Sequence, residues 1–260
     1  MYQRARLSSF KKVSRWARPT SFVLAIAFLG AGSWLALKGS PADYQQGETV
    51  RIMYVHVPAS WFALGVYVFM ALSALVGFVW KHPLADISAK AAAPIGLTLT
   101  AISLATGSLW GKPMWGAWWV WDARLTSMLV LFFLYVGYMS LISSCDDPAK
   151  GLKLGNVLLI LGLINIPIIK FSVEWWHTLH QPASVFKSGG SSIHSSMLIP
   201  LFTMASGYVM LISGIWFIRM ENEFLRRKIR SLKLSEWARE HYDDRPPCSE
   251  KESCDIKEAG

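Results

Sequence analysis

Histidine side chains in this sequence gather in segments that we expect to face one side of a membrane. Four of the six histidines are in such segments, and they are His56, His177, His180 and His194. A neutral imidazole is a good axial ligand for iron, and two imidazoles from different segments could hold a planar macrocycle between them. Taken singly, a histidine at a membrane interface more often bonds a lipid headgroup. The clustering on one side is what favours ligand binding.

Tryptophans are concentrated in residues 110–127, which read WGKPMWGAWWVWDARLTS. The segment's tryptophans are Trp110, Trp115, Trp118, Trp119 and Trp121. If the segment is helical, three of them and Asp122 follow i, i+3, i+4, i+7 spacing from Trp115 and form an aromatic shelf. The alternative is an aromatic belt, in which tryptophans lie at the level of the lipid headgroups, but such a belt needs only one or two indoles per helix end. Gly111 and Gly116 leave the backbone room for a flat ligand to approach.

A porphyrin fits this set of side chains. Its apolar disc stacks on indole, its iron binds imidazole, and its propionates pair with cationic groups such as Arg124, Lys112 and Arg51. Arg124 is equally suited to snorkelling toward phosphate headgroups. Asp122 next to Arg124 could instead form a local ion pair with it.

Six long apolar blocks must position these residues. The chain is 53% hydrophobic and 17% charged, and a helix needs roughly 17 to 25 apolar residues to cross hydrocarbon. We therefore predict an all-α integral membrane protein with six transmembrane helices. The blocks lie near residues 21–37, 59–80, 91–109, 126–143, 154–169 and 196–218, and the fifth is the shortest and contains Pro167.

Basic residues cluster in the two tails, which predicts that both termini are cytoplasmic. An even number of spans requires the same arrangement. We expect the first span to be retained rather than cleaved. The predicted organisation is a basic tail (1–20), a six-helix domain (21–218) with outer loops near 38–58, 110–125 and 170–195, and a helical extension with a flexible tail (219–260).

Several classes of function are disfavoured by what the sequence lacks. The net charge of +9 comes from loop clusters rather than one nucleic-acid-binding face. No nucleotide-phosphate loop is present, and the spans hold few ionisable groups for a proton-coupled carrier. We expect no enzymatic activity, because no nucleophile stands beside a base. The three cysteines, Cys145, Cys248 and Cys254, are expected in the cytoplasm, with no structural disulfide.

Three stretches resemble the tryptophan-rich haem-handling family of cytochrome c maturation, most closely its haem exporter protein C (CcmC) family. They are WGKPMWGAWWVWDARLTS, PADYQQG ahead of YVHVPASW, and IPIIKFSVEWWHTLHQ, and the resemblance covers residues 41–181. It implies that His56 and His180 are axial haem ligands, with the roles of His177 and His194 open. It also implies an outer haem platform matched here by Trp115, Gly116, Trp118, Trp119, Trp121 and Asp122.

The resemblance further implies a function and partners. Haem b would bind at a periplasmic platform and pass to the periplasmic haem chaperone CcmE, with the ABC transporter subunits CcmA and CcmB and the small membrane protein CcmD. The location would be the bacterial inner membrane. A quinone- or haem-dependent redox protein is the first alternative. The second is a channel or permease lined by the hydroxyls of residues 98, 100, 103 and 106, which more often pack helices together.

Overall fold

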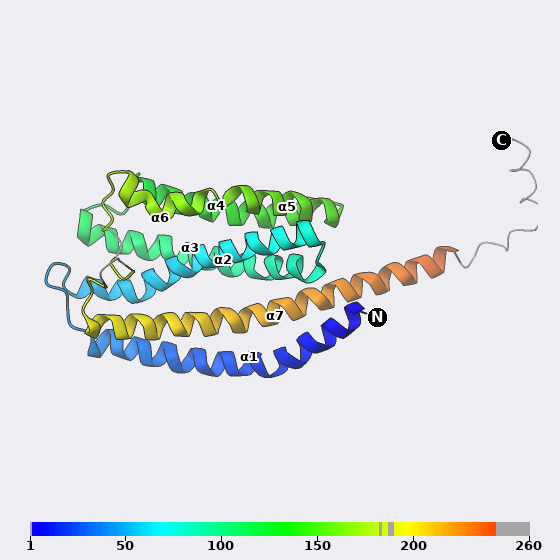
Figure 1. The fold of residues 1–260 in the computed structure, drawn as a ribbon, viewed down its shortest axis with the longest axis horizontal. Helices are drawn as coiled ribbons and strands as arrows, with labels where there is room; N and C mark the ends of the chain where they lie inside the picture. The colour runs from blue at the N-terminus through cyan, green and yellow to red at the C-terminus, as the bar shows by residue number, and fades with distance from the viewer. Residues whose placement is uncertain (1, 182–183, 187–189, 243–260) are drawn as a thin grey trace, which may run out of the picture. The chain divides into compact units, whose positions relative to one another are not determined.

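The computed structural model describes residues 2–181, 184–186 and 190–242, and regular structure in these residues is helical (Figure 1). A π-helical turn, Leu35–Gly39, follows α1, and a 3-10 turn, Glu48–Ile52, precedes α2. The helices are α1 (Tyr2–Trp34), α2 (Met53–Trp80), α3 (Pro83–Trp115), α4 (Ala123–Ser144), α5 (Pro148–Gly162), α6 (Asn165–Trp175) and α7 (Ser195–Tyr242).

In the part of the chain that the structure describes, six helical segments are long and apolar enough to cross a membrane, which agrees with the predicted number. They begin or end outside the apolar blocks, because polar residues continue the helices beyond the hydrocarbon-length core. The segments are Phe10–Gly39, Glu48–Trp80, Leu84–Trp115, Ala123–Ser144, Pro148–Trp175 and Ser195–His241.

The fifth segment is interrupted between α5 and α6, at Leu163 and Ile164. Pro167 explains the break, since proline has no N–H to donate and its ring clashes with the carbonyl four residues earlier, that of Leu163. The chain resumes as α6, which ends at Trp175, ahead of the loop that carries His180. Ile169 and Ser172 are the buried residues of α6 nearest that loop.

The structure divides into two compact units, the first ending at Glu221 and the second beginning at Asn222. The core of the first unit lies between α2, α3, α4 and α5 and is centred on Tyr67 and Tyr135, whose rings meet edge to face at 5.3 Å. The Tyr135 hydroxyl donates to the carbonyl of Ala63 at 2.8 Å. This hydrogen bond satisfies a buried polar group inside an apolar bundle.

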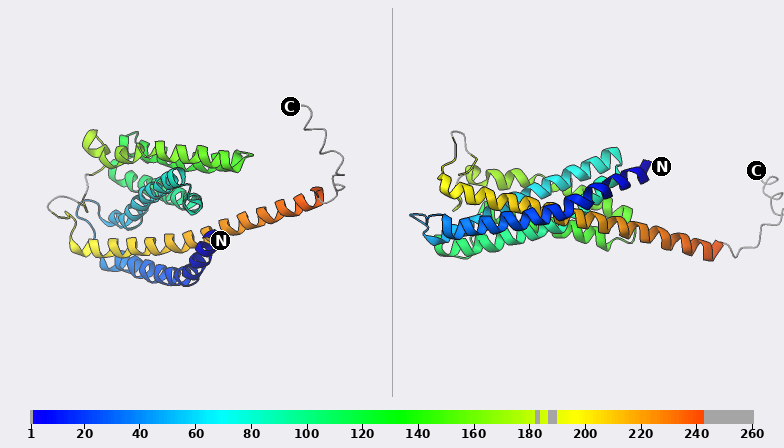
Figure 2. Two further views of the ribbon diagram at one scale, coloured as in Figure 1. Left: turned by 45° about the vertical axis from the view of Figure 1, so that its right-hand side comes forward. Right: turned by 90° about the horizontal axis from the view of Figure 1, so that it is seen from below.

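Helices α1 and α7 pack closely because glycines stand at their contact (Figure 2). A Cβ placed on Gly32 would lie 2.7 Å from the sulfur of Met204, and one on Gly207 would lie 2.7 Å from the side chain of Leu29. Small residues allow this approach between apolar helices in a membrane. At the far end of the same pair, Arg18 bonds Glu221 at 2.8 Å.

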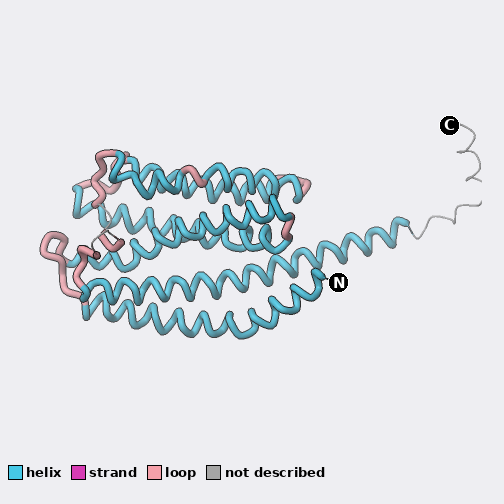
Figure 3. The backbone as a smooth tube through the Cα atoms, viewed as in Figure 1, coloured by secondary structure: helices cyan, strands magenta, loops and turns pink. Residues whose placement is uncertain are grey.

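The connections that carry the predicted site residues lie at one end of the first unit. Figure 3 shows the segment before α2, the α3–α4 connection and the α6–α7 connection together, with the α2–α3 and α4–α5 connections at the opposite end. Cys145 follows α4 at that opposite end and is a free thiol. Cys248 and Cys254 lie outside the described residues.

Candidate functional site

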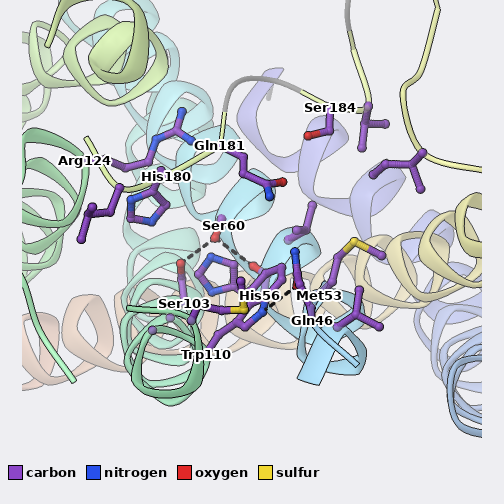
Figure 4. Close-up of a pocket in the computed structure, with 18 of the residues that line it drawn as sticks. Gln46, Met53, His56, Ser60, Ser103, Trp110, Arg124, His180, Gln181 and Ser184 are labelled. Atoms are coloured by element: carbon purple, nitrogen blue, oxygen red, sulfur yellow. Dashed lines mark hydrogen bonds between the residues drawn. The ribbon is translucent and has the colours of Figure 1, made fainter. Parts of the chain in front are cut away.

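A cavity of about 1090 Å³ opens among α2, α3, α4, α6 and the connections at this end. This volume is slightly above the range of about 300–1000 Å³ that is typical of small-molecule sites. Ten of its lining residues are labelled in Figure 4. Of the residues predicted to bind haem, His56, His180, Trp110, Trp115 and Arg124 line it, and Gly111 of the tryptophan segment does so as well.

His56 lies in the first turns of α2, whereas the sequence analysis assigned it to a loop. The helix begins at Met53, ahead of the apolar block predicted from residue 59. The His56 Nδ1 is 3.1 Å from the hydroxyl oxygen of Thr106 on α3. That hydroxyl gives its single proton to the carbonyl of Ile102, at 2.6 Å, so it accepts from His56. The Nδ1 therefore carries the proton, and the Nε2 lone pair is free.

His180 has the same tautomer but a different partner. Its Nδ1 lies 3.2 Å from the Asp122 Oδ2, and the Asp122 side chain is only 5% exposed. A carboxylate can only accept, so the Nδ1 of His180 carries a proton and its Nε2 is free. Two histidines from different elements thus line one cavity, each with an unprotonated Nε2.

Asp122 serves two elements at once. Its Oδ1 accepts from the backbone N–H of Leu125 at 2.7 Å and caps the start of α4, while its Oδ2 faces His180. The ion pair with Arg124 considered from the sequence is replaced by these contacts. Arg124 instead donates to the hydroxyl of Ser172 at 3.2 Å.

Burial lowers the pKa of His180, while the hydrogen bond and the charge of Asp122 oppose that shift. The net direction is down, so the imidazole is neutral at neutral pH. A neutral imidazole is the form that binds iron.

The tryptophan segment is not one helix, so the aromatic shelf predicted from helical spacing is wrong. Helix α3 ends at Trp115, and Gly116 follows with φ +76°, a left-handed conformation that stops the helix. Gly116 therefore makes a turn, and a Cβ there would meet nothing within 4 Å. Among described residues, the cavity lining excludes Gly116, Trp118, Trp119, Trp121 and Asp122.

Two tryptophans of the segment stand against the two histidines. Trp110 meets His56 edge-on with ring centres 5.7 Å apart, and Trp115 meets His180 in the same manner at 4.9 Å. Gln46 accepts from the Trp110 indole N–H at 3.1 Å and holds that ring (Figure 4). The indoles of Trp118 and Trp121 are exposed, at 56% and 76%. Trp119 packs edge-on against Trp121 at 5.5 Å.

Of the three predicted cationic groups, only Arg124 lines the cavity. Arg51 bonds Glu48 and the carbonyl of Ala36, which ties the loop after α1 to the start of α2. Lys112 donates to the carbonyl of Gly116 at 3.1 Å. The cavity instead gains a cation that the sequence analysis did not select, Lys170 of α6.

His194 lines the cavity, whereas His177 is outside its described lining. The Nδ1 of His194 accepts from the backbone N–H of Ser196 at 3.3 Å, so the proton is on Nε2. This tautomer is the opposite of that in His56 and His180. His194 is therefore not prepared for coordination through Nε2.

Sequence analysis missed Thr106, Gln46 and Lys170 as parts of this site. Thr106 was considered only as a channel-lining or helix-packing residue. No sequence signal links it to His56, which is 50 positions away. The hydroxyls of Thr98 and Thr100 donate to carbonyls of their own helix, at 2.9 and 2.7 Å, and offer no line of free donors for a channel.

The fold and site define a class, a multi-pass helical membrane protein with a ligand-sized cavity at one end of its helices. Residues 1–235 match the family model described as "CcmC: Heme exporter protein C". The chain belongs to the heme exporter protein C family.

Relatives carrying the name "Heme exporter protein C" extend over most of the chain. The protein of Bradyrhizobium diazoefficiens is 49% identical over 221 residues, covering 85% of this chain and 84% of the relative. That of Haemophilus influenzae is 47% identical, covering 80% and 85%. That of Escherichia coli K12 is 42% identical, covering 86% and 91%.

Proposed function

We propose that this chain binds haem b in the cavity, with His56 and His180 as the axial ligands of the iron, and presents it for export and cytochrome c assembly. One observation carries the proposal. Two histidines from separate elements line one cavity, and each has its Nδ1 proton engaged and its Nε2 lone pair free. Membership in the heme exporter protein C family supports haem as the ligand.

The remaining lining suits the rest of a haem molecule. Trp110 and Trp115 offer apolar ring edges beside the two histidines. Arg124 and Lys170 offer cationic groups to the propionates, which favour guanidinium and ammonium partners. The outer part of the haem platform is proposed to consist of Gly116, Trp118, Trp119 and Trp121.

The site end of the helices is proposed to face the periplasm, with both tails in the cytoplasm of a bacterium and the helices in its inner membrane. The basic residues of both tails support this orientation. The domain organisation proposed is a basic tail (1–20), a transmembrane haem-handling domain (21–218) and a cytoplasmic extension (219–260).

The acceptor of the haem is proposed to be the periplasmic chaperone CcmE, with the ABC transporter subunits CcmA and CcmB and the membrane protein CcmD completing the assembly. The exposed indoles of Trp118 and Trp121 support a docking role, because large exposed aromatic side chains mark interaction surfaces. They directly follow Trp115, which lines the cavity.

Replacement of the proposed ligands tests the function. In His56→Ala and His180→Ala we expect loss of the low-spin haem absorbance of the purified protein, because one axial bond is removed in each. The absorbance spectrum of the bound haem is the readout, and haem content from pyridine haemochrome normalises it. His241→Ala is the control, since His241 lies in the second unit. Unchanged absorbance in both variants would reject the ligand assignment.

Transfer is tested by co-purification with CcmE. We expect haem in the chaperone after incubation with the wild-type protein and none with His180→Ala. Haem in the chaperone from both proteins would contradict a delivery role for this site.

A further inference from the structure

The two histidines of the cavity differ in what accepts their Nδ1 protons. His180 donates to a buried carboxylate, that of Asp122, whereas His56 donates to a neutral hydroxyl, that of Thr106. The further hydrogen-bond partner of the His56 ring is also uncharged, namely the backbone carbonyl of Ser103, whose hydroxyl is joined to that of Ser60 at 2.6 Å. The charge of Arg124 acts on both histidines, so it does not distinguish them. The two positions are therefore electrostatically unequal.

An imidazole whose N–H is bonded to a carboxylate is the better electron donor to a metal. The negative charge draws the Nδ1 proton away and raises the basicity of Nε2, and such partners also fix the ring orientation. A hydroxyl orients the ring but adds no charge. Arg124 is near His180 and opposes the effect of Asp122, but its guanidinium is directed to Ser172 while the carboxylate touches the ring.

The elements that carry the two histidines also differ. His56 is fixed within α2, where its ring lies against Gly107 of α3. His180 lies in the connection after α6 and is held there through Asp122 and Trp115. The stronger ligand therefore belongs to a connecting segment and the weaker one to the helical bundle.

We propose that His180 is the anchoring ligand of the haem iron and His56 the ligand that is released first, with Asp122 and Thr106 as the positioning residues that set this difference. The inference rests on the proposed function. In release, the His56 Nε2–iron bond breaks, the electron pair returns to Nε2, and an acceptor's ligand takes the vacated position without any change in the oxidation state of the iron. The acceptor would then engage the haem from the α2 side while His180 still holds it, and the haem would leave when the bond to His180 breaks in turn.

The affinities of the two single-ligand proteins test the order. Haem is titrated into detergent-purified His56→Ala and His180→Ala, and the dissociation constants are compared. We expect His180→Ala to bind haem roughly tenfold more weakly than His56→Ala, since a hydrogen-bond partner of a ligating imidazole is worth roughly 10- to 100-fold in metal affinity. If both variants bind more weakly than the wild type but with equal affinities, or in the reverse order, the inference is rejected and the assignment of both histidines as ligands stands. Wild-type affinity in both variants rejects the proposed function itself.

Asp122→Asn shows whether the carboxylate is the cause. Asparagine is also a good helix cap, so α4 keeps its start while the charge is lost. We expect weaker haem binding in the His56→Ala background and no further loss in the His180→Ala background, where there is no imidazole for Asp122 to act on. A loss of equal size in both backgrounds shows a structural role only and overturns the assignment of Asp122.

The reduction potential of the bound haem is a second readout that misfolding does not imitate. The carboxylate-bonded imidazole stabilises ferric iron, so Asp122→Asn should shift the potential to more positive values. Thr106→Val should give a smaller shift, and Thr106→Ser, which restores the hydroxyl, should give none. A larger shift in Thr106→Val than in Asp122→Asn contradicts the proposed order.

Discussion

At the residue scale, the site depends on small side chains as much as on the histidines. Gly107 stands where the ring of His56 lies against α3, and a Cβ there would be 3.1 Å from the ring's Cε1. Contacts this short displace the neighbouring group. The hydrogen bond from His56 to Thr106, one residue before the glycine, requires the ring to stay where it is.

We therefore expect Gly107→Ala to weaken haem binding several-fold, because the added methyl group pushes the His56 ring away from Thr106. The measurement is a haem titration of the purified variant. Gly65→Ala, on α2 with nothing within 4 Å of the added Cβ, is the matched control and should bind as the wild type does. Equal affinities for the two variants would show that the ring position tolerates the methyl group.

At the element scale, the molecule uses glycine and proline to direct its helices. Gly116 ends α3 immediately after Trp115, and Pro167 divides the fifth span into α5 and α6. Glycines also set the separation of α1 and α7, where Gly207 faces Leu29 and Gly32 faces Met204.

Gly207→Ala is expected to destabilise the protein by about 1–3 kcal/mol, because overpacking forces two helices apart. Thermal unfolding in detergent, followed by circular dichroism, measures this effect. Gly30→Ala on α1 is the control, since a Cβ at Gly30 meets nothing within 4 Å and alanine is the better helix former. A melting temperature for Gly207→Ala at or above that of Gly30→Ala contradicts the packing account.

At the scale of the whole molecule, the end of the first unit that carries the cavity is opposite to the end that carries Cys145 (Figure 3). The loop after α1 belongs to the cavity end, and its Tyr44 is 91% exposed. The proposed orientation puts the end that carries Cys145 in the cytoplasm, because basic residues are concentrated in both tails.

Labelling with a membrane-impermeant maleimide tests the orientation. In a protein whose cysteines are all replaced by serine, Tyr44→Cys should react in intact spheroplasts. A second protein that keeps only Cys145 should react after permeabilisation alone. The reverse pattern would place the cavity on the cytoplasmic side and overturn the proposed delivery to a periplasmic chaperone.

The sequence by itself determined the class of fold, the number of spans and the segments that carry the site. Crossing a membrane depends on the length and hydropathy of one continuous stretch, which is a local property. For residues 116–122 two local signals disagreed, because the predicted organisation put them in a loop near 110–125 whereas the spacing from Trp115 would have required a helix. Gly116, with φ +76°, ends the helix and decides for the loop.

Only the tertiary structure decided which side chains hold the two histidines. Thr106 is 50 positions from His56, and Asp122 is 58 positions from His180, and a hydrogen bond between such residues follows from how α2, α3 and the loop after α6 pack. No local pattern encodes those distances. The charge difference between the two ligand positions is likewise a property of the folded site, because it exists only where a buried carboxylate meets one imidazole and not the other.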